Sequence, residues 1–344
     1  AEDELAAVGM AIGANWNGSR GFTATSGPGI SLMSEFLGLA YFAEVPLVIF
    51  NIQRGGPSTG MPTRTQQSDI LSCAYASHGD TKHVLLFPED PQECFEFSAE
   101  AFNLAERLQT PVFVISDLDI GMNDWVTDKF EWDDEQKYDR GKVLKAEDLD
   151  KMDNFGRYLD VDDDGICYRT YPGTHPEKGA FFTRGTSHDE YARYTENGDI
   201  NEQTLTRLVK KFRTASELVP DPIINLSEKQ GSSGVIFYGS TSAAMYEAKD
   251  ILNENNIEVD LMRIRSFPFN LDVWEFIENH DLIYVIEQNR DSQMRTLIMA
   301  EGGISAEKLR SLVWFNGDPI QAKFIAKKIY CLLYTSDAAD EGHC

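Results

Sequence analysis

The stretch that decides the fold is Val45-Pro-Leu-Val-Ile-Phe-Asn-Ile52, which is followed at once by Gln53-Arg-Gly-Gly-Pro-Ser-Thr-Gly-Met-Pro-Thr63. The first part is an almost unbroken apolar run, which is typical of a strand buried on both faces of a parallel sheet. The second part is rich in glycine and proline and predicts a loop at the carboxyl end of that strand. Open parallel sheets bind ligands at this end, so the loop is the first candidate site.

The same alternation of strand and helix patterns fills residues 1–126. Apolar residues at helical spacing predict a first helix that begins near Glu4. Further helices are expected at Leu32–Phe42 and Pro91–Gln109, and further strands at Phe22–Thr25, His83–Phe87 and Pro111–Ser116. Strands and helices that alternate along the chain are typical of an α/β fold with a parallel sheet.

A second, smaller α/β domain is expected at residues 232–330. It is predicted from strand patterns at Gly234–Gly239, Ile257–Ile264, Leu282–Glu287 and Leu312–Phe315, and helical patterns at Ser242–Asn255, Asp272–Asn279, Asp291–Glu301 and Pro319–Ile329. Between the two domains, residues 127–231 are dominated by Asp, Gly, Lys, Pro and Tyr and show one clear helix, at Asn201–Glu217. We interpret this part as a loop-rich connecting segment that packs over a neighbouring surface.

The last residues read as foreign to the protein. The run from Cys331 to Glu341, CLLYTSDAADE, resembles the translation of a transposon adapter used in DNA library preparation. We therefore expect residues 331–344 to be a non-native tail and the true C-terminus to be missing.

Composition excludes several classes of function. The chain has 344 residues with 31 basic and 56 acidic side chains, a formal net charge of −25, which opposes binding to nucleic acids and to anionic membranes. The longest apolar runs are far too short to span a bilayer. Five cysteines occur without a CxxC pair, so neither a disulfide scaffold nor a metal site of this chain's own is indicated. A reduced, cytoplasmic environment is expected.

The candidate site residues come from three segments. Arg54 lies directly after a predicted buried strand, where its guanidinium is suited to bind a carboxylate through two hydrogen bonds, and Ser58, Thr59 and Thr63 add hydroxyl donors. The turn Thr25-Ser26-Gly27 joins a strand to a helix and presents backbone N–H groups. Glu4 begins the first helix. Each has an ordinary alternative: a solvated loop, a common connection and a charge that complements the helix dipole.

These segments together resemble the alpha subunit of the 2-oxoacid:ferredoxin oxidoreductases, with the 2-oxoglutarate type as the best match. The resemblance rests on TSGPG at residues 25–29, on the RGGPSTG string that begins at Arg54, on VISD at 114–117, and on Val285-Ile-Glu-Gln-Asn289 with SQM at 292–294. It implies a thiamine-diphosphate-binding domain of the pyrimidine type, a parallel-sheet domain lacking its N-terminal strand, followed by a domain like the transketolase C-terminal one.

The resemblance also implies roles. Glu4, with Glu2 as the alternative, matches the glutamate that contacts the aminopyrimidine N1′ of thiamine diphosphate, beside the turn Thr25-Ser26-Gly27. Arg54 matches the arginine that holds the substrate carboxylate, and Thr63 a hydroxyl near the oxo acid. A beta subunit would supply the diphosphate and Mg²⁺ site and a [4Fe-4S] cluster. The 2-oxo acid, most simply 2-oxoglutarate, would be converted to its acyl-coenzyme A, with electrons passing to ferredoxin.

Alternatives stay open at this point. Pyruvate or a branched 2-oxo acid could be the substrate, the chain could belong to another thiamine enzyme, or it could be an acidic scaffold without chemistry. The run Asp160–Gly165 copies the opening of a calcium-binding EF-hand loop, but Tyr171 stands where the bidentate glutamate is needed. A structural role is expected for His78, a buried filling role for Cys73 and Cys94, and for Asp69 either orientation of the Arg54 loop or a place at a helix N-terminus.

Overall fold

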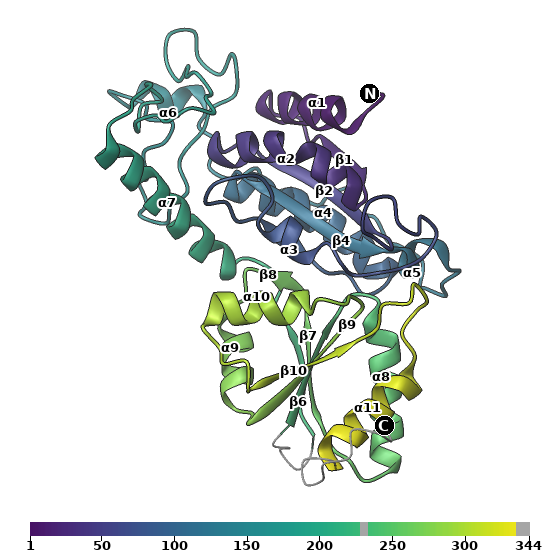
Figure 1. Cartoon of the computed structure of the whole chain (residues 1–344). Coiled ribbons are helices and arrows are strands. Elements are labelled where there is room, and N and C mark those ends of the chain that lie inside the picture. The colour runs from purple at the N-terminus through teal and green to yellow at the C-terminus, as the bar shows by residue number, and fades with distance from the viewer. Residues whose placement is uncertain (228–232, 335–344) are drawn as a thin grey trace.

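The computed structural model describes residues 1–227 and 233–334, and they form two α/β units stacked end to end (Figure 1). The first sheet has the strand order β1-β2-β4-β3-β8 and the second the order β10-β9-β6-β7-β5. In each sheet four neighbouring strands run parallel, and the fifth, an edge strand (β8 or β5), runs antiparallel to its neighbour. The expected α/β class is confirmed.

The first sheet lies between two layers of helices because its strands are apolar on both faces. Its strands are β1 (Phe22–Thr25), β2 (Leu47–Gln53), β3 (Val84–Leu86) and β4 (Pro111–Asp117), and its helices are α1 (Glu4–Trp16), α2 (Gly27–Phe42), α3 (Ile70–Ala74), α4 (Pro91–Leu108) and α5 (Leu118–Met122). Leu47 and Ile49 belong to the core that contains α1 and α2, whereas Val48 belongs to the core that contains α4. Side chains that alternate along a strand thus fill both layers.

The second sheet is built in the same way. Its strands are β5 (Ile223–Asn225), β6 (Ser233–Tyr238), β7 (Asp260–Ile264), β9 (Leu282–Glu287) and β10 (Leu309–Val313), and its helices are α8 (Thr241–Glu254), α9 (Leu271–Glu278), α10 (Gln293–Gly302) and α11 (Ala322–Tyr334). Helices α8 and α11 cover one face, and α9 and α10 cover the other. The core on the α10 side is continuous with the core around α2 and α3 of the first unit, so the two units share one apolar interior.

Strand β8 (Ser266–Phe267), which the sequence did not predict, joins the two units directly. It follows β7 of the second sheet but pairs antiparallel with β3 of the first, Leu85 opposite Phe267. A buried ion pair reinforces this junction: Arg263 of β7 donates to both carboxylate oxygens of Glu93 in α4, over 2.6 and 2.9 Å. The edge strand β5, also unpredicted, lies antiparallel to β7.

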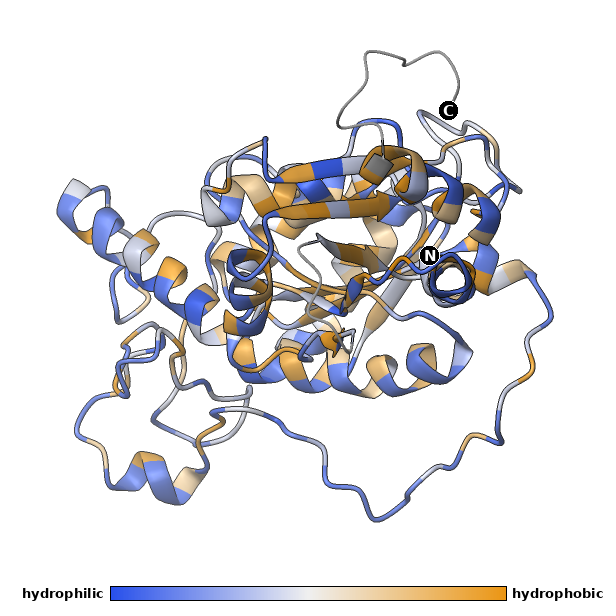
Figure 2. Cartoon of the chain, turned by 90° about the horizontal axis from the view of Figure 1, so that it is seen from below, coloured by the Kyte–Doolittle hydropathy of each residue, from blue (hydrophilic) through white to orange (hydrophobic). Residues whose placement is uncertain are grey.

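The connecting segment lies to one side of the first unit (Figure 1) and includes a long, mostly hydrophilic loop that stands out from the helices and strands (Figure 2). Beyond the expected helix, found as α7 (Gly198–Ser216), it contains a short α6 (Ala146–Asp150). It is anchored on Glu44, whose carboxylate is fully buried and accepts from Lys211 over 2.8 Å and from Arg207. The two cations hold the pKa of Glu44 well below its usual range despite the burial. Arg157 donates to the backbone oxygen of Glu44 over 2.8 Å.

The end of the described chain bears on the expected tail. Helix α11 runs on through Cys331 to Tyr334, and Leu333 packs against the core under α8. The rest of the expected tail, residues 335–344, lies outside the described residues.

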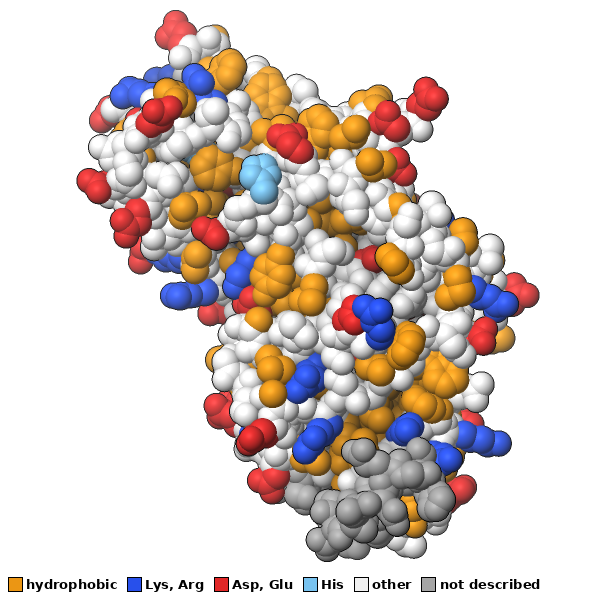
Figure 3. Space-filling view, in the orientation of Figure 1, with side chains coloured by type: hydrophobic (Ala, Val, Ile, Leu, Met, Phe, Trp, Pro, Cys, Tyr) orange, Lys and Arg blue, Asp and Glu red, His pale blue; other side chains and the backbone are white. Residues whose placement is uncertain are grey.

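The acidic side chains do not form a single patch on the face of the molecule shown in Figure 3, where carboxylates are scattered. No helix in residues 1–227 and 233–334 combines the length and apolar character that crossing a membrane requires.

Candidate active site

Three parallel strands of the first sheet end side by side in polar residues. Strands β1, β2 and β4 end at Thr25, Gln53 and Asp117, and Gln53 and Asp117 are register partners. Because the strands are parallel, the segments that follow them all start at this one edge of the sheet. They are the start of α2, the loop that carries Arg54, and α5, so the segments singled out from the sequence meet here.

Glu4 lies beside the first turn of α2. It is the first residue of α1, and the α1 N-cap Asp3 accepts a hydrogen bond from the Ala6 N–H over 2.7 Å, which fixes the start of the helix. A Cβ atom built on Gly29 would stand 2.8 Å from Cγ of Glu4 and 1.9 Å from Oγ1 of Thr25. Only glycine allows this approach. The half-buried Glu4 and the end of β1 are thereby brought together over the N-terminus of α2.

The loop after β2 is a compact turn that closes on itself. The Met61 N–H donates to the Gly55 oxygen over 2.7 Å, and the Gly55 N–H donates to the Arg64 oxygen over 2.8 Å. Gly60 stands where the chain turns back, with φ of +45°, and a Cβ there would lie 1.9 Å from the Gly55 oxygen. The three hydroxyl residues expected from the sequence to serve the site, Ser58, Thr59 and Thr63, are all exposed.

Arg54 stands at the base of this loop with a donor that the protein leaves unused. Its Nε atom is buried and has no hydrogen-bond acceptor among the described residues. Leaving a charged donor buried without an acceptor costs free energy. A ligand carboxylate at this position would remove that cost, which is the chemistry predicted for Arg54 from the sequence.

Asp69 is a largely buried carboxylate between the Arg54 loop and α2. Its Oδ2 atom accepts from Nδ2 of Asn51 over 3.2 Å, and its Oδ1 atom would lie 2.7 Å from a Cβ built on Gly27. Burial raises the pKa of Asp69, although the Asn51 hydrogen bond and the Arg54 charge act in the opposite direction. Asp69 occupies the N-cap position of α3, the helix N-terminal place that was one of its two expected roles, although its side chain makes no cap hydrogen bond.

Polar groups of the second unit also reach this edge, and the sequence reasoning missed them. Oδ2 of Asp117 accepts from the hydroxyl of Ser240, which follows β6, over 2.6 Å. Burial raises the pKa of Asp117. Gln67, on the return half of the Arg54 loop, is 1% exposed and is bonded to Tyr238, the last residue of β6, and to Gln288, the residue after β9. The available signal was a run of polar residues, Gln288 and Asn289, directly after a buried strand.

Comparisons with known proteins place this arrangement in a family. The profile described as pyruvate flavodoxin/ferredoxin oxidoreductase, thiamine diphosphate-binding, matches residues 1–214. The 2-oxoglutarate synthase subunit KorA of Methanothermobacter thermautotrophicus is 35% identical over 299 residues, covering 84% of this chain and 74% of that protein. The chain belongs to the 2-oxoacid:ferredoxin oxidoreductase alpha-subunit family.

Other members agree with this assignment. The alpha subunit of 2-oxoacid:ferredoxin oxidoreductase 2 of Aeropyrum pernix is 33% identical, covering 98% of this chain and 51% of that protein. The chain thus spans about half the length of such relatives. The 2-oxoglutarate:ferredoxin oxidoreductase of Magnetococcus marinus, solved with 2-oxoglutarate, coenzyme A and succinyl-CoA bound, superposes with a TM-score of 0.85 at 28% identity, over 96% of this chain and 56% of that one. A split-gene transketolase, at 10% identity and a TM-score of 0.52, shares the fold.

The residues present fit the cofactor that the family profile names. The close approach at Gly29 holds the Glu4 side chain beside the start of α2, and a carboxylate is the kind of group that could pair with the aminopyrimidine of thiamine diphosphate. The unused Nε donor of Arg54 lies at the same edge of the sheet. In residues 1–227 and 233–334, no three His, Cys, Asp or Glu side chains form a group that could hold a metal ion.

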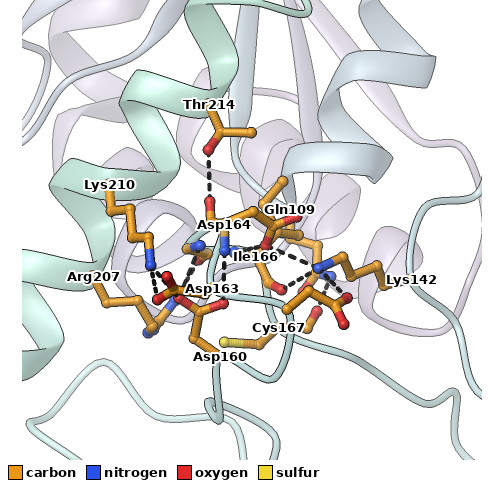
Figure 4. Close-up of polar contacts among 12 residues, drawn as sticks. Gln109, Lys142, Asp160, Asp163, Asp164, Ile166, Cys167, Arg207, Lys210 and Thr214 are labelled. Atoms are coloured by element: carbon orange, nitrogen blue, oxygen red, sulfur yellow. Dashed lines mark hydrogen bonds and ion pairs between the residues drawn. The ribbon is translucent and has the colours of Figure 1, made fainter.

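The acidic run Asp160–Gly165 is held by lysines (Figure 4). Lys142 donates to Asp164 over 2.9 Å and pairs with Asp162 over 2.7 Å, while Lys210 pairs with Asp160 and Asp163. The loop is closed by the N–H of Gly165, which donates to Asp160 over 2.9 Å. Two ammonium groups are therefore paired with the carboxylates that an EF-hand would turn toward calcium.

The remaining candidates from the sequence are one histidine and two cysteines. His78 is exposed in the loop that leads into the amino end of β3, where Nδ1 lies 3.4 Å from the hydroxyl of Ser77. Cys73 is fully buried in α3 beside Asn51, and burial raises the pKa of its thiol. Cys94 is half-buried in α4, with its sulfur 3.9 Å from the hydroxyl of Ser116.

Proposed function

We propose that this chain is the substrate-binding portion of the alpha subunit of a 2-oxoacid:ferredoxin oxidoreductase, with 2-oxoglutarate as its substrate. The observation that carries the proposal is the buried Nε donor of Arg54, which has no acceptor among the described residues. Every 2-oxo acid has a carboxylate that this guanidinium could bind. The KorA relatives and the Magnetococcus enzyme, whose names specify 2-oxoglutarate, favour that substrate over pyruvate.

Thiamine diphosphate, when bound, supplies the carbon nucleophile for attack on a 2-oxo carbonyl. The chain's own residues would prepare that reaction. Glu4 holds a proton at N1′ of the aminopyrimidine through its carboxylate. Arg54 binds and orients the substrate carboxylate. The exposed hydroxyls of Ser58, Thr59 and Thr63 line the outer side of the loop, within the part of the site that a partner subunit would cover.

The proposal requires a partner. A beta subunit would hold the diphosphate with its Mg²⁺ and the [4Fe-4S] cluster, coenzyme A would receive the acyl group, and ferredoxin would receive the electrons. The relatives are named as alpha subunits of multi-subunit enzymes, which supports a beta-subunit partner. Without it, this chain would bind substrate but complete no turnover.

The test uses the complete gene co-expressed with its beta-subunit gene. We would measure coenzyme A-dependent reduction of a viologen dye with 2-oxoglutarate and with pyruvate, in the wild type and in Arg54→Ala. Arg64→Ala is the matched control because Arg64 lies on the same loop, is exposed and pairs with Asp318. We expect 2-oxoglutarate turnover whose kcat/KM falls by roughly 30-fold or more in Arg54→Ala, as for removal of a charged partner at a binding site.

The outcomes separate the parts of the proposal. Turnover of pyruvate but not of 2-oxoglutarate would correct the substrate and leave the family role intact. Equal kinetics for Arg54→Ala and Arg64→Ala would refute the role of Arg54. No turnover of any 2-oxo acid, with thiamine diphosphate and clusters verified as bound, would refute the proposed activity.

A further inference from the structure

The second sheet has a binding position of its own at its carboxyl edge. Strand β6 is the first of its four parallel strands in the chain; β7 lies on one side of β6, and the chain then crosses to place β9 on the other side. The point between β6 and β9, where the direction of strand addition reverses, is where open α/β sheets bind ligands. In this protein the position is filled by the protein itself.

Gln67 of the first unit occupies it. Its Nε2 donates to the oxygen of Tyr238, the last residue of β6, over 3.3 Å. Its Oε1 accepts from the N–H of Gln288, the residue after β9, over 3.2 Å and from the hydroxyl of Thr241 over 3.3 Å. Its backbone N–H donates to the Gln288 oxygen over 2.8 Å, and its backbone oxygen accepts from Asn289 over 3.0 Å. Both backbone atoms and both side-chain polar atoms of Gln67 are thus bonded to the second unit.

The residues after Gln67 are held by the same edge. Nε2 of Gln293, at the start of α10, donates to the Ser68 oxygen over 2.6 Å, and its Oε1 accepts from the Leu71 N–H over 3.1 Å. Asn289 is itself fixed, because its side chain also donates to the buried Glu287 over 2.7 Å. The second unit therefore holds residues 67–71, which are the last residues of the loop and the first two of α3.

These held residues are continuous with the Arg54 loop. Immediately before Gln67, Oε1 of Gln66 accepts from the Gly56 N–H over 3.1 Å. Two residues after it, the Asp69 N–H donates to Oε1 of Gln53, the residue preceding Arg54, over 2.9 Å. A displacement of Gln67 would be transmitted to both sides of Arg54 through these short hydrogen bonds.

We propose that the carboxyl edge of the second sheet is a docking site for residues 67–71 of the same chain, and that Gln67 seated in it is a positioning residue for Arg54. The inference rests on the proposed function of Arg54 as the group that binds the substrate carboxylate. Gln67 makes no contact with substrate in this role. It fixes the base of the loop so that the guanidinium meets the carboxylate in one geometry, and small misplacements of such a group reduce catalysis strongly.

The experiment compares Gln67→Met with Gln109→Met in the complex with the beta subunit. Both glutamines are at most 1% exposed, but Gln109 lies before β4 at the opposite edge of the first sheet, where its Nε2 donates to the Cys167 oxygen over 2.6 Å. Two readouts are taken: KM and kcat for the 2-oxo acid, and hydrogen–deuterium exchange of residues 54–66. We expect Gln67→Met to raise KM by about tenfold or more, with kcat much less affected, and to speed exchange in the loop, whereas Gln109→Met changes neither.

Each outcome decides the matter. If Gln67→Met lowers the thermal midpoint as Gln109→Met does but leaves KM and loop exchange at wild-type values, the residue is only structural and the inference is wrong. If Gln67→Met does not fold, the near-isosteric Thr241→Val removes one bond to Gln67 and should give the same changes at smaller size. If Arg54→Ala leaves KM unchanged, the proposed function fails, and loop exchange still reports whether Gln67 holds the loop.

Discussion

The two sheets present their carboxyl edges to different surroundings. The edge of the first sheet carries groups that could still form hydrogen bonds with a ligand. They are the half-buried Glu4, the Arg54 Nε without an acceptor among the described residues, and Asp69 with one amide partner. The edge of the second sheet is filled by Gln67, and its carboxylate Glu287 is fully buried. One sheet thus keeps an edge for chemistry, while the other uses the equivalent edge to hold part of the first.

The strongest test of this difference compares one carboxylate from each edge. Glu287 accepts from the Met294 N–H over 2.8 Å, from the Arg295 N–H over 3.3 Å and from Asn289. Glu287→Ala would leave these buried donors unpaired and should lower the free energy of unfolding by about 3–5 kcal/mol. Glu4→Ala should lower it by less than about 1 kcal/mol, because a first-turn acidic residue contributes little. Denaturant unfolding of both variants measures this, and equal losses would contradict the comparison.

The hydrogen bond between the two sheets' carboxyl edges should make an intermediate contribution to the free energy of unfolding. Ser240→Ala removes the hydroxyl that donates to Asp117 over 2.6 Å, and we expect a loss of about 2 kcal/mol, because a hydrogen bond to a charged group is worth more than a neutral one. Ser98 is the matched control, since its hydroxyl donates to the Cys94 backbone oxygen over 2.6 Å. Ser98→Ala should cost about 1 kcal/mol. A smaller loss for Ser240→Ala than for Ser98→Ala would show that the interdomain contact is dispensable.

A third test uses pH. Burial, followed by the nearby Asp117 charge, raises the pKa of Asp119 to about 6. Because the folded state favours the protonated form, this group's contribution to stability is complete below its unfolded pKa, near about 4, and is lost as pH rises through about 6. Asp119→Asn should therefore reduce the decline in stability across that window, as followed by unfolding midpoints at several pH values. A decline as steep as in the wild type would contradict the assignment.

The smallest effect on stability is expected for the exposed ion pair between the two units. Arg64 pairs with Asp318 of the second unit over 3.0 Å, but both side chains are more than half exposed, at 58% and 54%. Arg64→Ala should change stability by less than about 1 kcal/mol, as is usual for exposed ion pairs. If the unfolding midpoint of Arg64→Ala fell as far as that of Ser240→Ala, the contact between the two units would depend on this exposed ion pair rather than on the buried Gln67.

The sequence predicted the helices and strands far better than the contacts between the two units. Strands Leu282–Glu287 and Phe22–Thr25 were predicted at their observed bounds, the first because an apolar run bounded by polar residues carries that information locally, and the second from residues of high β-propensity. Strand β8 was missed because two residues give no periodic pattern, and its partner lies in another unit. The resemblance likewise pointed to Arg54 and Glu4, whereas Gln67 was not identified as an interdomain contact. Its importance depends on Tyr238 and Gln288, which only the folded chain brings to it.

Strand β8 has a consequence for how the protein can be made. Until Ser266 and Phe267 leave the ribosome, β3 remains an unpaired border of the first sheet, and an open border invites pairing with another nascent chain. A fragment cut at the end of the matched family region, residue 214, would keep that border permanently. The first sheet is therefore completed only late in synthesis, when β8 pairs with β3. The two units should accordingly be expressed and purified as one chain.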